Sequence, residues 1–272
     1  MNFLFLTALK AEARPLMEAF ELIKDPVSHL YINENISLLI TGVGKAKTGD
    51  RIQTLLKHDK DFGETVVFNI GIAGGNRRET NVGELYWVNS IHDEDSGQTF
   101  FPDILLRHQL KEKSLTTVSK GVTKNGDRYA GLVDMEGSAI FRLMSKKVPP
   151  HRLVFLKVVS DYMDVTDWKT LDLAGLIKNQ VDLIQSIMAD FGNEFLSDRM
   201  ILNHEEMEMV NGGAEKLMLT ETQRIQLVDW SENYKKRTAN KLGGLNSYLN
   251  RESKSKQERN KIFDEIRQFL SA

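Results

Sequence analysis

The chain has 272 residues, of which 41% are hydrophobic and 8% aromatic, the composition of a globular protein that can bury a full core. Its formal net charge of −2 gives no global reason to expect nucleic acid or an anionic membrane as a partner. The absence of cysteine excludes disulfides, thiolate catalysis and cysteine-ligated metal centres.

The N-terminal segment does not have the pattern of a signal peptide. The apolar run at residues 2–8 is short, no basic region precedes it, and Lys10, Glu12 and Arg14 follow directly. No run approaches the roughly 20 apolar residues of a membrane span. We therefore expect a soluble, cytoplasmic protein.

The first two thirds of the chain alternate between apolar runs of strand length and segments with helical spacing. The expected elements are a strand at 2–8, a helix at 12–22, a hairpin within 30–45 that turns at 33–35, a helix at 46–56 and strands at 65–75 and 83–91, then a strand at 115–124, a helix at 135–147, a strand at 152–161 and a helix at 173–191. Continuously apolar strands that alternate with helices indicate a sheet covered on both faces. We therefore predict an α/β domain at residues 1–192, with a mixed, largely parallel central sheet flanked by helices.

The sequence changes in character from about residue 193. Charges of both signs become dense, and apolar residues recur at helical spacing in segments 219–242 and 258–272. Because Leu, Ile, Trp and Phe continue to appear, disorder is disfavoured. We predict a helical C-terminal extension at residues 193–272.

Three carboxylates lie at the ends of predicted strands or the starts of predicted helices. Glu12 lies just past the first strand, Glu136 opens a helix, and Asp161 ends the last apolar strand. Each has a structural interpretation, since Glu136 can complement a helix dipole, Asp161 can cap a helix, and Glu12 can be a solvated helix residue. In an open α/β sheet, however, ligands bind beyond the carboxyl ends of the strands. Together the three carboxylates predict a site at that edge.

The strand at 65–75 ends in Gly-Ile-Ala-Gly-Gly, with almost no side chains. Small residues allow a ligand to approach the backbone, although they also form tight turns. The glycines at 41–50 do not form a P-loop, because Gly49 is followed by Asp50 rather than by Lys and Ser or Thr. Neither cluster matches G-x-G-x-x-G, so an enzyme of nucleoside triphosphates or dinucleotides is disfavoured.

Five sequence blocks occur in an order that is typical of one superfamily. They are TALKAEARPL (7–16), TGVGKAKTG (41–49), VFNIGIAGG (67–75), VDMEGSAI (133–140) and VVSDYMD (158–164). In these blocks, over roughly residues 1–190, the chain resembles the purine nucleoside phosphorylase and nucleosidase superfamily. It is most similar to methylthioadenosine/S-adenosylhomocysteine nucleosidases and to futalosine hydrolases, and the last two blocks are the most diagnostic.

The resemblance implies a role for residues in these blocks. Glu12 matches the base that activates water, and Glu136 matches the ligand of the ribose diol, with Met135 packed under the sugar. Asp161 matches the acid that protonates or hydrogen-bonds purine N7, steadied by Ser160.

These roles suit the cleavage of an N-glycosidic bond, which builds positive charge on the sugar and negative charge on the departing base. A carboxylate accepts two vicinal hydroxyls, and an Asp beside an apolar strand can have its pKa raised and so donate a proton. The small residues within 71–75 would let the backbone form the floor under the sugar and the base, with Ile72, Ala73 and Gly74 as candidate substrate-binding residues.

The choice between water and phosphate as nucleophile depends on two further positions. Phosphorylases of the superfamily bind phosphate with an arginine and a hydroxyl side chain, whereas this chain has Asn69 and Ile72 there. Arg77 or Arg78 could compensate from the adjoining loop, although surface positions suit both. We therefore predict a nucleoside N-ribohydrolase, with a phosphorylase or a non-catalytic nucleoside-binding or partner-binding module as alternatives.

One departure from the family pattern concerns the base. Nucleosidases carry an aromatic residue that stacks on adenine in a stretch that matches VSKGVTKNG (118–126), where this chain has Thr123. Either the base pocket uses other side chains, for which Phe100, Phe101 and Tyr129 are candidates, or the base is not adenine. We predict Thr123 as a candidate substrate-binding residue.

We predict no cofactor and no metal site. The six histidines are scattered, HEEME (204–208) lacks the second His of a zinc motif, and HDEDSG (92–97) reads as an exposed acidic turn. Nucleic acid is disfavoured, because acidic residues offset the locally basic KSKQERNK (254–261). The resemblance implies a small-molecule nucleoside as substrate and a homo-oligomer, with a dimer favoured.

Overall fold

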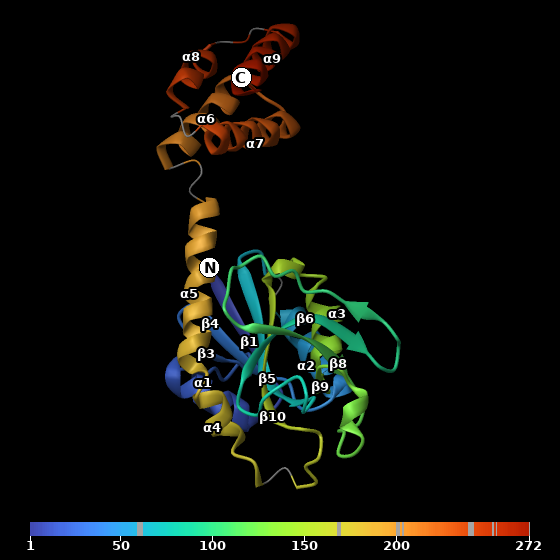
Figure 1. The fold of residues 1–272 in the computed structure, drawn as a ribbon. Helices are drawn as coiled ribbons and strands as arrows, with labels where there is room; N and C mark the ends of the chain where they lie inside the picture. Colours follow the sequence, from blue (N-terminus) through green and yellow to red (C-terminus); the bar gives the residue numbers. More distant parts are fainter. Residues whose placement is uncertain are drawn as a thin grey trace. The chain divides into compact units, whose positions relative to one another are not determined.

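A computed structural model describes residues 1–58, 62–167, 170–199, 202, 204–238, 242–251, 253 and 255–271 (Figure 1). The chain divides into two compact units, Met1–Phe191 and Gly192–Ala272. Among the helices of the described residues, none combines the length and the apolar character needed to cross a bilayer.

The first unit is built on one large sheet. Its strands are β1 (Asn2–Thr7), β2 (Ile23–Lys24), β3 (Tyr31–Asn33), β4 (Ile36–Ile40), β5 (Thr65–Gly75), β6 (Leu85–Asp93), β7 (Thr99–Phe100), β8 (Lys111–Thr117), β9 (Leu132–Asp134) and β10 (Leu153–Asp161). Strand β5 is long enough to pair in parallel with β1 and β10 along most of its length, and antiparallel with β9 through Gly74 and Gly75 at its end. Because β10 pairs with β6, β6 with β8 and β8 with β9, the sheet closes into a ring that begins and ends at β5.

The helices of this unit cover both faces of the sheet. They are α1 (Lys10–Ala19), α2 (Lys45–His58), α3 (Gly137–Met144), α4 (Leu173–Lys178) and the part of α5 (Val181–Arg199) up to Phe191, with short 3-10 turns at Gly126–Arg128 and Pro150–Arg152. Helix α1 packs against α4 on one side of the sheet, and α2 packs against α3 on the other (Figure 1). The mixed, largely parallel α/β fold predicted from the sequence is confirmed.

Strand β1 illustrates why the central strands have no polar face. Phe5 packs against Phe20, just after α1, with ring centroids 5.3 Å apart. Its neighbour Leu6 belongs to the core cluster that contains Ile52 of α2 and Ile140 of α3. Successive side chains of a strand point to opposite faces, so both faces are buried and the apolar run is continuous.

Two predicted elements differ from the structure. The strand expected at 115–124 is β8 (Lys111–Thr117). Its pairing with β9 ends at Thr117, opposite Asp134, and the residues after it form an irregular loop. The single helix expected at 173–191 is two helices, since α4 ends at Lys178 with Asn179 as its C-cap and α5 begins at Val181. Between them, the Gln180 side chain donates a hydrogen bond to the Gly83 carbonyl. Helix α5 then runs on to Arg199, past the expected end near Gly192.

The second unit is helical. It contains α6 (His204–Lys216), α7 (Glu221–Thr238), a 3-10 turn at Leu242–Leu245, α8 (Asn246–Leu249) and α9 (Lys256–Ser271). Its own apolar core includes Leu227, Leu245 and Ile266, and Trp230 packs against Phe263 with ring centroids 5.0 Å apart. The amphipathic segments predicted at 219–242 and 258–272 correspond to α7 and α9.

Candidate active site

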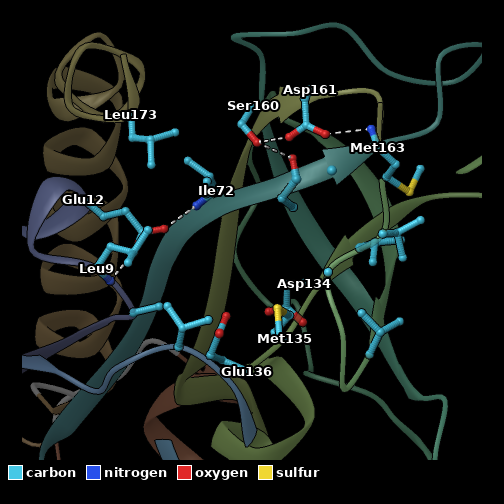
Figure 2. A pocket seen from close by; sticks show the side chains of 18 residues that line it. Leu9, Glu12, Ile72, Asp134, Met135, Glu136, Ser160, Asp161, Met163 and Leu173 are labelled. Atoms are coloured by element: carbon cyan, nitrogen blue, oxygen red, sulfur yellow. Dashed lines mark hydrogen bonds between the residues drawn. The ribbon is translucent and has the colours of Figure 1, made fainter. Parts of the chain in front are cut away.

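A cavity of about 300 Å³ lies in the first unit, where β1, β5 and β10 end, and β9 and the start of α3 close it (Figure 2). Parallel pairing aligns the carboxyl ends of β1, β5 and β10, and the closure of the ring adds β9 to the same place. Of the residues that the sequence singled out for a site, the cavity wall contains Glu12, Ile72, Ala73, Gly74, Met135, Glu136, Ser160 and Asp161.

Glu12 reaches the cavity from the first turn of α1. Its Oε1 accepts a hydrogen bond from the Ile72 amide at 2.9 Å, and its Oε2 accepts one from the Leu9 amide at 2.7 Å (Figure 2). Burial raises the pKa of Glu12, and the two amides together with the charge of Lys157 oppose that rise. The carboxyl is therefore fixed in orientation and has the raised pKa that suits a general base near neutral pH.

The glycine that opens Gly-Ile-Ala-Gly-Gly is required by this carboxyl. A Cβ placed on Gly71 would lie 2.9 Å from Glu12 Oε1, too close for normal packing. At the other end of the stretch, a Cβ on Gly74 would lie 2.6 Å from the Met163 side chain, and one on Gly75 would lie 2.2 Å from Thr80 Oγ1. These glycines make room for protein side chains, while Ile72, Ala73 and Gly74 also line the cavity.

Glu136 is the N-cap residue of α3 and lies at the opposite side of the cavity from Asp161 (Figure 2). Its Oε1 accepts a hydrogen bond from the Gly44 amide at 2.7 Å, in the glycine turn that follows β4. Burial and the negative charge of Asp134 raise the pKa of Glu136 to about 7, and the charge of Lys157 opposes them. The carboxyl therefore gains or loses its proton within the physiological pH range.

Asp161 is the last residue of β10, at a register shift in the pairing with β5. The Ser160 hydroxyl donates to its Oδ2 at 2.6 Å, and the Met163 amide donates to its Oδ1 at 2.7 Å (Figure 2). Burial raises the pKa of Asp161, and these two hydrogen bonds oppose the rise. Met163 adopts a φ of 61°, a left-handed conformation that costs energy outside glycine, so the turn that supplies this amide is strained.

Thr123 lies outside the cavity, contrary to the placement expected from the sequence. It lines a neighbouring surface hollow with Lys124 and Arg128, whereas Gly121 and Val122 of the same loop reach the cavity wall. Thr123 was placed by its match to the family motif, whereas in this chain residues 118–124 form an irregular loop.

The aromatic candidates for the base pocket do not line the cavity, although Tyr129 packs in one buried cluster with Val118, Val133 and Met163 of its wall. Phe100 stacks on Phe141 at 5.2 Å, Phe101 is 63% exposed, and the Tyr129 hydroxyl donates to Glu94. The cavity wall near Asp161 is instead aliphatic and thioether in character, with side chains from β9 and the neighbouring loops. They are Val118, Val122, Val133 and Met163.

Two functional candidates were missed by the sequence analysis. Asp134 lines the cavity, and its Oδ2 lies 2.9 Å from Nζ of Lys157, which is 2% exposed. A lysine inside the apolar strand 152–161 was the available signal, because lysine is almost never fully buried without a partner. Its partner could not be read from the sequence, since it comes from another strand. In the described part of the chain, no group of three or more histidine or acidic side chains is arranged to hold a metal ion.

Comparison with solved structures identifies the fold. No protein-family model matches the chain, and no curated protein matches it. Among solved structures, the methylthioadenosine/S-adenosylhomocysteine nucleosidase (MTAN) of Chlamydia trachomatis is 19% identical with a TM-score of 0.57, covering 68% of this chain and 98% of its own. The 5′-methylthioadenosine nucleosidase of Arabidopsis thaliana is 22% identical with a TM-score of 0.53, covering 68% and 95%.

A third example is the 5′-methylthioadenosine/S-adenosylhomocysteine nucleosidase of S. pneumoniae, solved with a transition-state inhibitor. It is 18% identical with a TM-score of 0.55, and the match covers 67% of this chain and 97% of that one. At such identities the similarity establishes the fold. Over about two thirds of its length, the chain shares the fold of these nucleosidases.

Proposed function

We propose that the first unit is a nucleoside N-ribohydrolase, which cleaves the N-glycosidic bond of a purine-type nucleoside with water as nucleophile. The observation that carries this proposal is the convergence of Glu12, Glu136 and Asp161 on one cavity of about 300 Å³. The fold shared with several nucleosidases supports it.

On the sugar side, the proposal assigns the ribose diol to Glu136. An ionised carboxylate can accept hydrogen bonds from two vicinal hydroxyls, and these bonds strengthen as the sugar gains positive charge. Met135 lies beside Glu136 on the cavity wall and would pack under the sugar ring. Because the pKa of Glu136 is about 7, substrate binding should favour release of its proton.

On the base side, the proposal assigns the leaving group to Asp161. A carboxyl with a raised pKa can stay protonated near neutral pH and hydrogen-bond or protonate the departing base at N7. The Ser160 hydroxyl and the Met163 amide hold its orientation. The base itself would pack against Val118 and Val133, which are buried in the adjoining cluster.

Glu12 would align and activate the attacking water. Each of its oxygens already accepts one amide hydrogen bond, and a carboxylate oxygen can accept a second. The Leu9 and Ile72 amides fix its orientation, and burial raises its pKa. It would therefore take a proton from a water as that water attacks the anomeric carbon.

Water suits this cavity better than phosphate does. The sugar side carries Glu12, Asp134 and Glu136, and a phosphate dianion placed there would be repelled by them. Arg77, a candidate phosphate ligand from the sequence, binds Asp164 at 2.7 Å and covers the Tyr162 ring. The two alternative functions are a phosphorylase and a nucleoside-binding module without turnover. The assay described next distinguishes both from a hydrolase.

The assay measures free base released from methylthioadenosine, S-adenosylhomocysteine, futalosine and inosine, with and without phosphate. We expect phosphate-independent release from at least one of them. Asp161→Asn and Glu12→Gln should each reduce kcat by about 100-fold or more, the range of general acid–base catalysis. Glu79→Gln, at an exposed carboxyl that pairs with Lys113, is the matched control and should keep wild-type kcat.

Three outcomes would contradict the proposal. An absolute phosphate requirement would make the protein a phosphorylase, and tight binding without turnover would make it a binding module. Full activity in Asp161→Asn and Glu12→Gln would place the chemistry elsewhere.

We also propose that the protein is a homo-oligomer, with a dimer favoured. The fold shared with the nucleosidases and the sequence resemblance support this proposal. Light scattering on the full chain tests it, and a monomer across the micromolar range would contradict it.

A further inference from the structure

A buried lysine lies beside the proposed site, and none of the steps above uses it. Lys157 is in the middle of β10 and is 2% exposed. Its Nζ lies 2.9 Å from Oδ2 of Asp134, which is itself buried at the end of β9. Burying an ammonium group is costly even when it is paired, so a hydrophobic residue would often be tolerated better at such a position.

The partner of Lys157 organises the start of α3. Asp134 Oδ2 also accepts a hydrogen bond from the Gly137 amide at 2.9 Å, and its Oδ1 accepts one from the Thr117 hydroxyl at 2.8 Å. The same hydroxyl oxygen of Thr117 accepts a bond from the Ser138 amide at 3.0 Å. Gly137 and Ser138 form the first turn of α3, directly after Glu136, so this network fixes the backbone that carries the proposed diol ligand.

The charged groups around Lys157 come from three elements. They are Glu12 on α1, Asp134 on β9 and Glu136 at the start of α3, and all three raise the pKa of Lys157. In return, the positive charge of Lys157 lowers the pKa of both Glu12 and Glu136. Asp134 acts on Glu136 in the opposite sense.

We propose that Lys157 is a positioning residue of this cavity: its ion pair with Asp134 holds the start of α3, and its buried charge keeps Glu12 and Glu136 available as carboxylates. The first part follows from the chain of contacts from Nζ through Asp134 to Gly137. The second follows from the placement of one cation among three acidic side chains inside the protein, where charges interact strongly. The catalytic meaning of this inference rests on the proposed function.

Loss of Lys157 would raise the pKa of both carboxyls and so favour their protonated forms. A protonated Glu136 would donate a hydrogen bond to the diol instead of accepting one from each hydroxyl, and a protonated Glu12 could not take a proton from water. The fold could remain intact while the working pH range moved upward. A pH profile therefore separates this role from a merely structural one.

The first experiment measures carboxyl pKa values directly in the full chain without ligand, by NMR titration of ¹³C-labelled glutamate side chains. In Lys157→Met, which keeps the chain length and removes the charge, we expect the pKa of Glu12 and of Glu136 to rise by about 1 pH unit or more. Lys111→Met is the matched control, because Lys111 is 61% exposed and pairs with Glu84. It should leave both values unchanged.

A double variant keeps the test decisive if Lys157→Met leaves Asp134 unpaired and fails to fold. In Lys157→Met with Asp134→Asn, both charges of the pair are removed together. Glu12 should still titrate higher than in the wild type, because the cation near it is gone. Glu136 should titrate close to its wild-type value, because a raising and a lowering influence are both removed. Unchanged pKa values of Glu12 in both variants would overturn the inference.

The second experiment records kcat/KM against pH on a substrate that the assay above identifies. The acidic limb of the Lys157→Met profile should move upward by about 1 pH unit, with recovery of activity at high pH. A uniform loss at every pH would overturn the electrostatic role. Because the NMR titration needs no turnover, a protein with shifted carboxyls and no activity would refute the proposed function and leave the inference about Lys157 standing.

Discussion

The two units of this protein bury different kinds of side chain. Among the described residues, the first unit buries Glu12, Glu136, Lys157 and Asp161 around one cavity, each held by hydrogen bonds or an ion pair. In the second unit, the buried polar residues that the structure describes are Ser231 and Ser253, and the core is aliphatic and aromatic. Buried charge does not favour folding, so its concentration in one unit indicates where chemistry, rather than stability, determines the residues.

The comparison predicts that damage to the apolar core of the second unit lowers stability without changing the cavity. Leu227 is fully buried on α7, and Leu227→Ala should destabilise that unit by about 2–5 kcal/mol. Differential scanning calorimetry should show one transition moved to lower temperature, with kcat/KM unchanged. Leu6→Ala, at a fully buried residue of the first unit, is the matched change and should lower both stability and activity. A loss of activity in Leu227→Ala would show that the units do not act independently.

A second prediction concerns the glycine that accommodates Glu12. In Gly71→Ala the new Cβ would meet Glu12 Oε1 at 2.9 Å and displace the carboxyl. We expect a fall of about 100-fold in kcat, the size of effect that a small misplacement of a reacting group can produce. Gly212→Ala in α6, where a Cβ would meet nothing within 4 Å, is the control and should leave kcat unchanged. Normal turnover by Gly71→Ala would contradict the assigned role of Glu12.

A third prediction uses the pH dependence of stability. The pKa of Glu136 in the folded protein is about 7, above the ordinary value of 4.5. The contribution of this carboxyl to stability is therefore fully present below pH 4.5 and is lost as the pH rises through 7. Glu136→Gln keeps an acceptor for the Gly44 amide and cannot ionise.

Urea unfolding at several pH values tests this. At pH 8 the Glu136→Gln variant should be more stable than the wild type by about 1–3 kcal/mol, and the difference should shrink towards pH 5. The same variant should bind nucleoside more weakly at pH 8, where the wild type is ionised. A stability difference that does not vary with pH would mean that Glu136 titrates normally.

The smallest expected effect is at Thr123. Because this side chain lines the outer hollow rather than the cavity, Thr123→Ala should leave kcat/KM on every substrate unchanged. Val133→Ala, at a buried residue of the cavity wall, should raise KM, since it removes packing for the base. If both substitutions raised KM equally, Thr123 would have to contact the base after all.

Features that depend on local periodicity and on residue type could be predicted from the sequence. The continuous apolar runs of β1, β5 and β10 indicated strands buried on both faces, and the helical spacing of 219–242 and 258–272 indicated α7 and α9. The positions of Glu12, Glu136 and Asp161 at element ends were also visible, because such ends are read from the apolar pattern alone.

Features that depend on pairing between distant segments could not be predicted from the sequence and became visible in the folded protein. The closure of the strand ring at β5 brings Asp134 next to Lys157, although neither residue signals the other along the chain. The same holds for Gly71, which is small because a carboxylate from α1 lies against it, and for Thr123, which an irregular loop directs away from the cavity. Periodicity reports which face of an element is buried, whereas partners across the sheet are set by register and closure, which no local pattern contains.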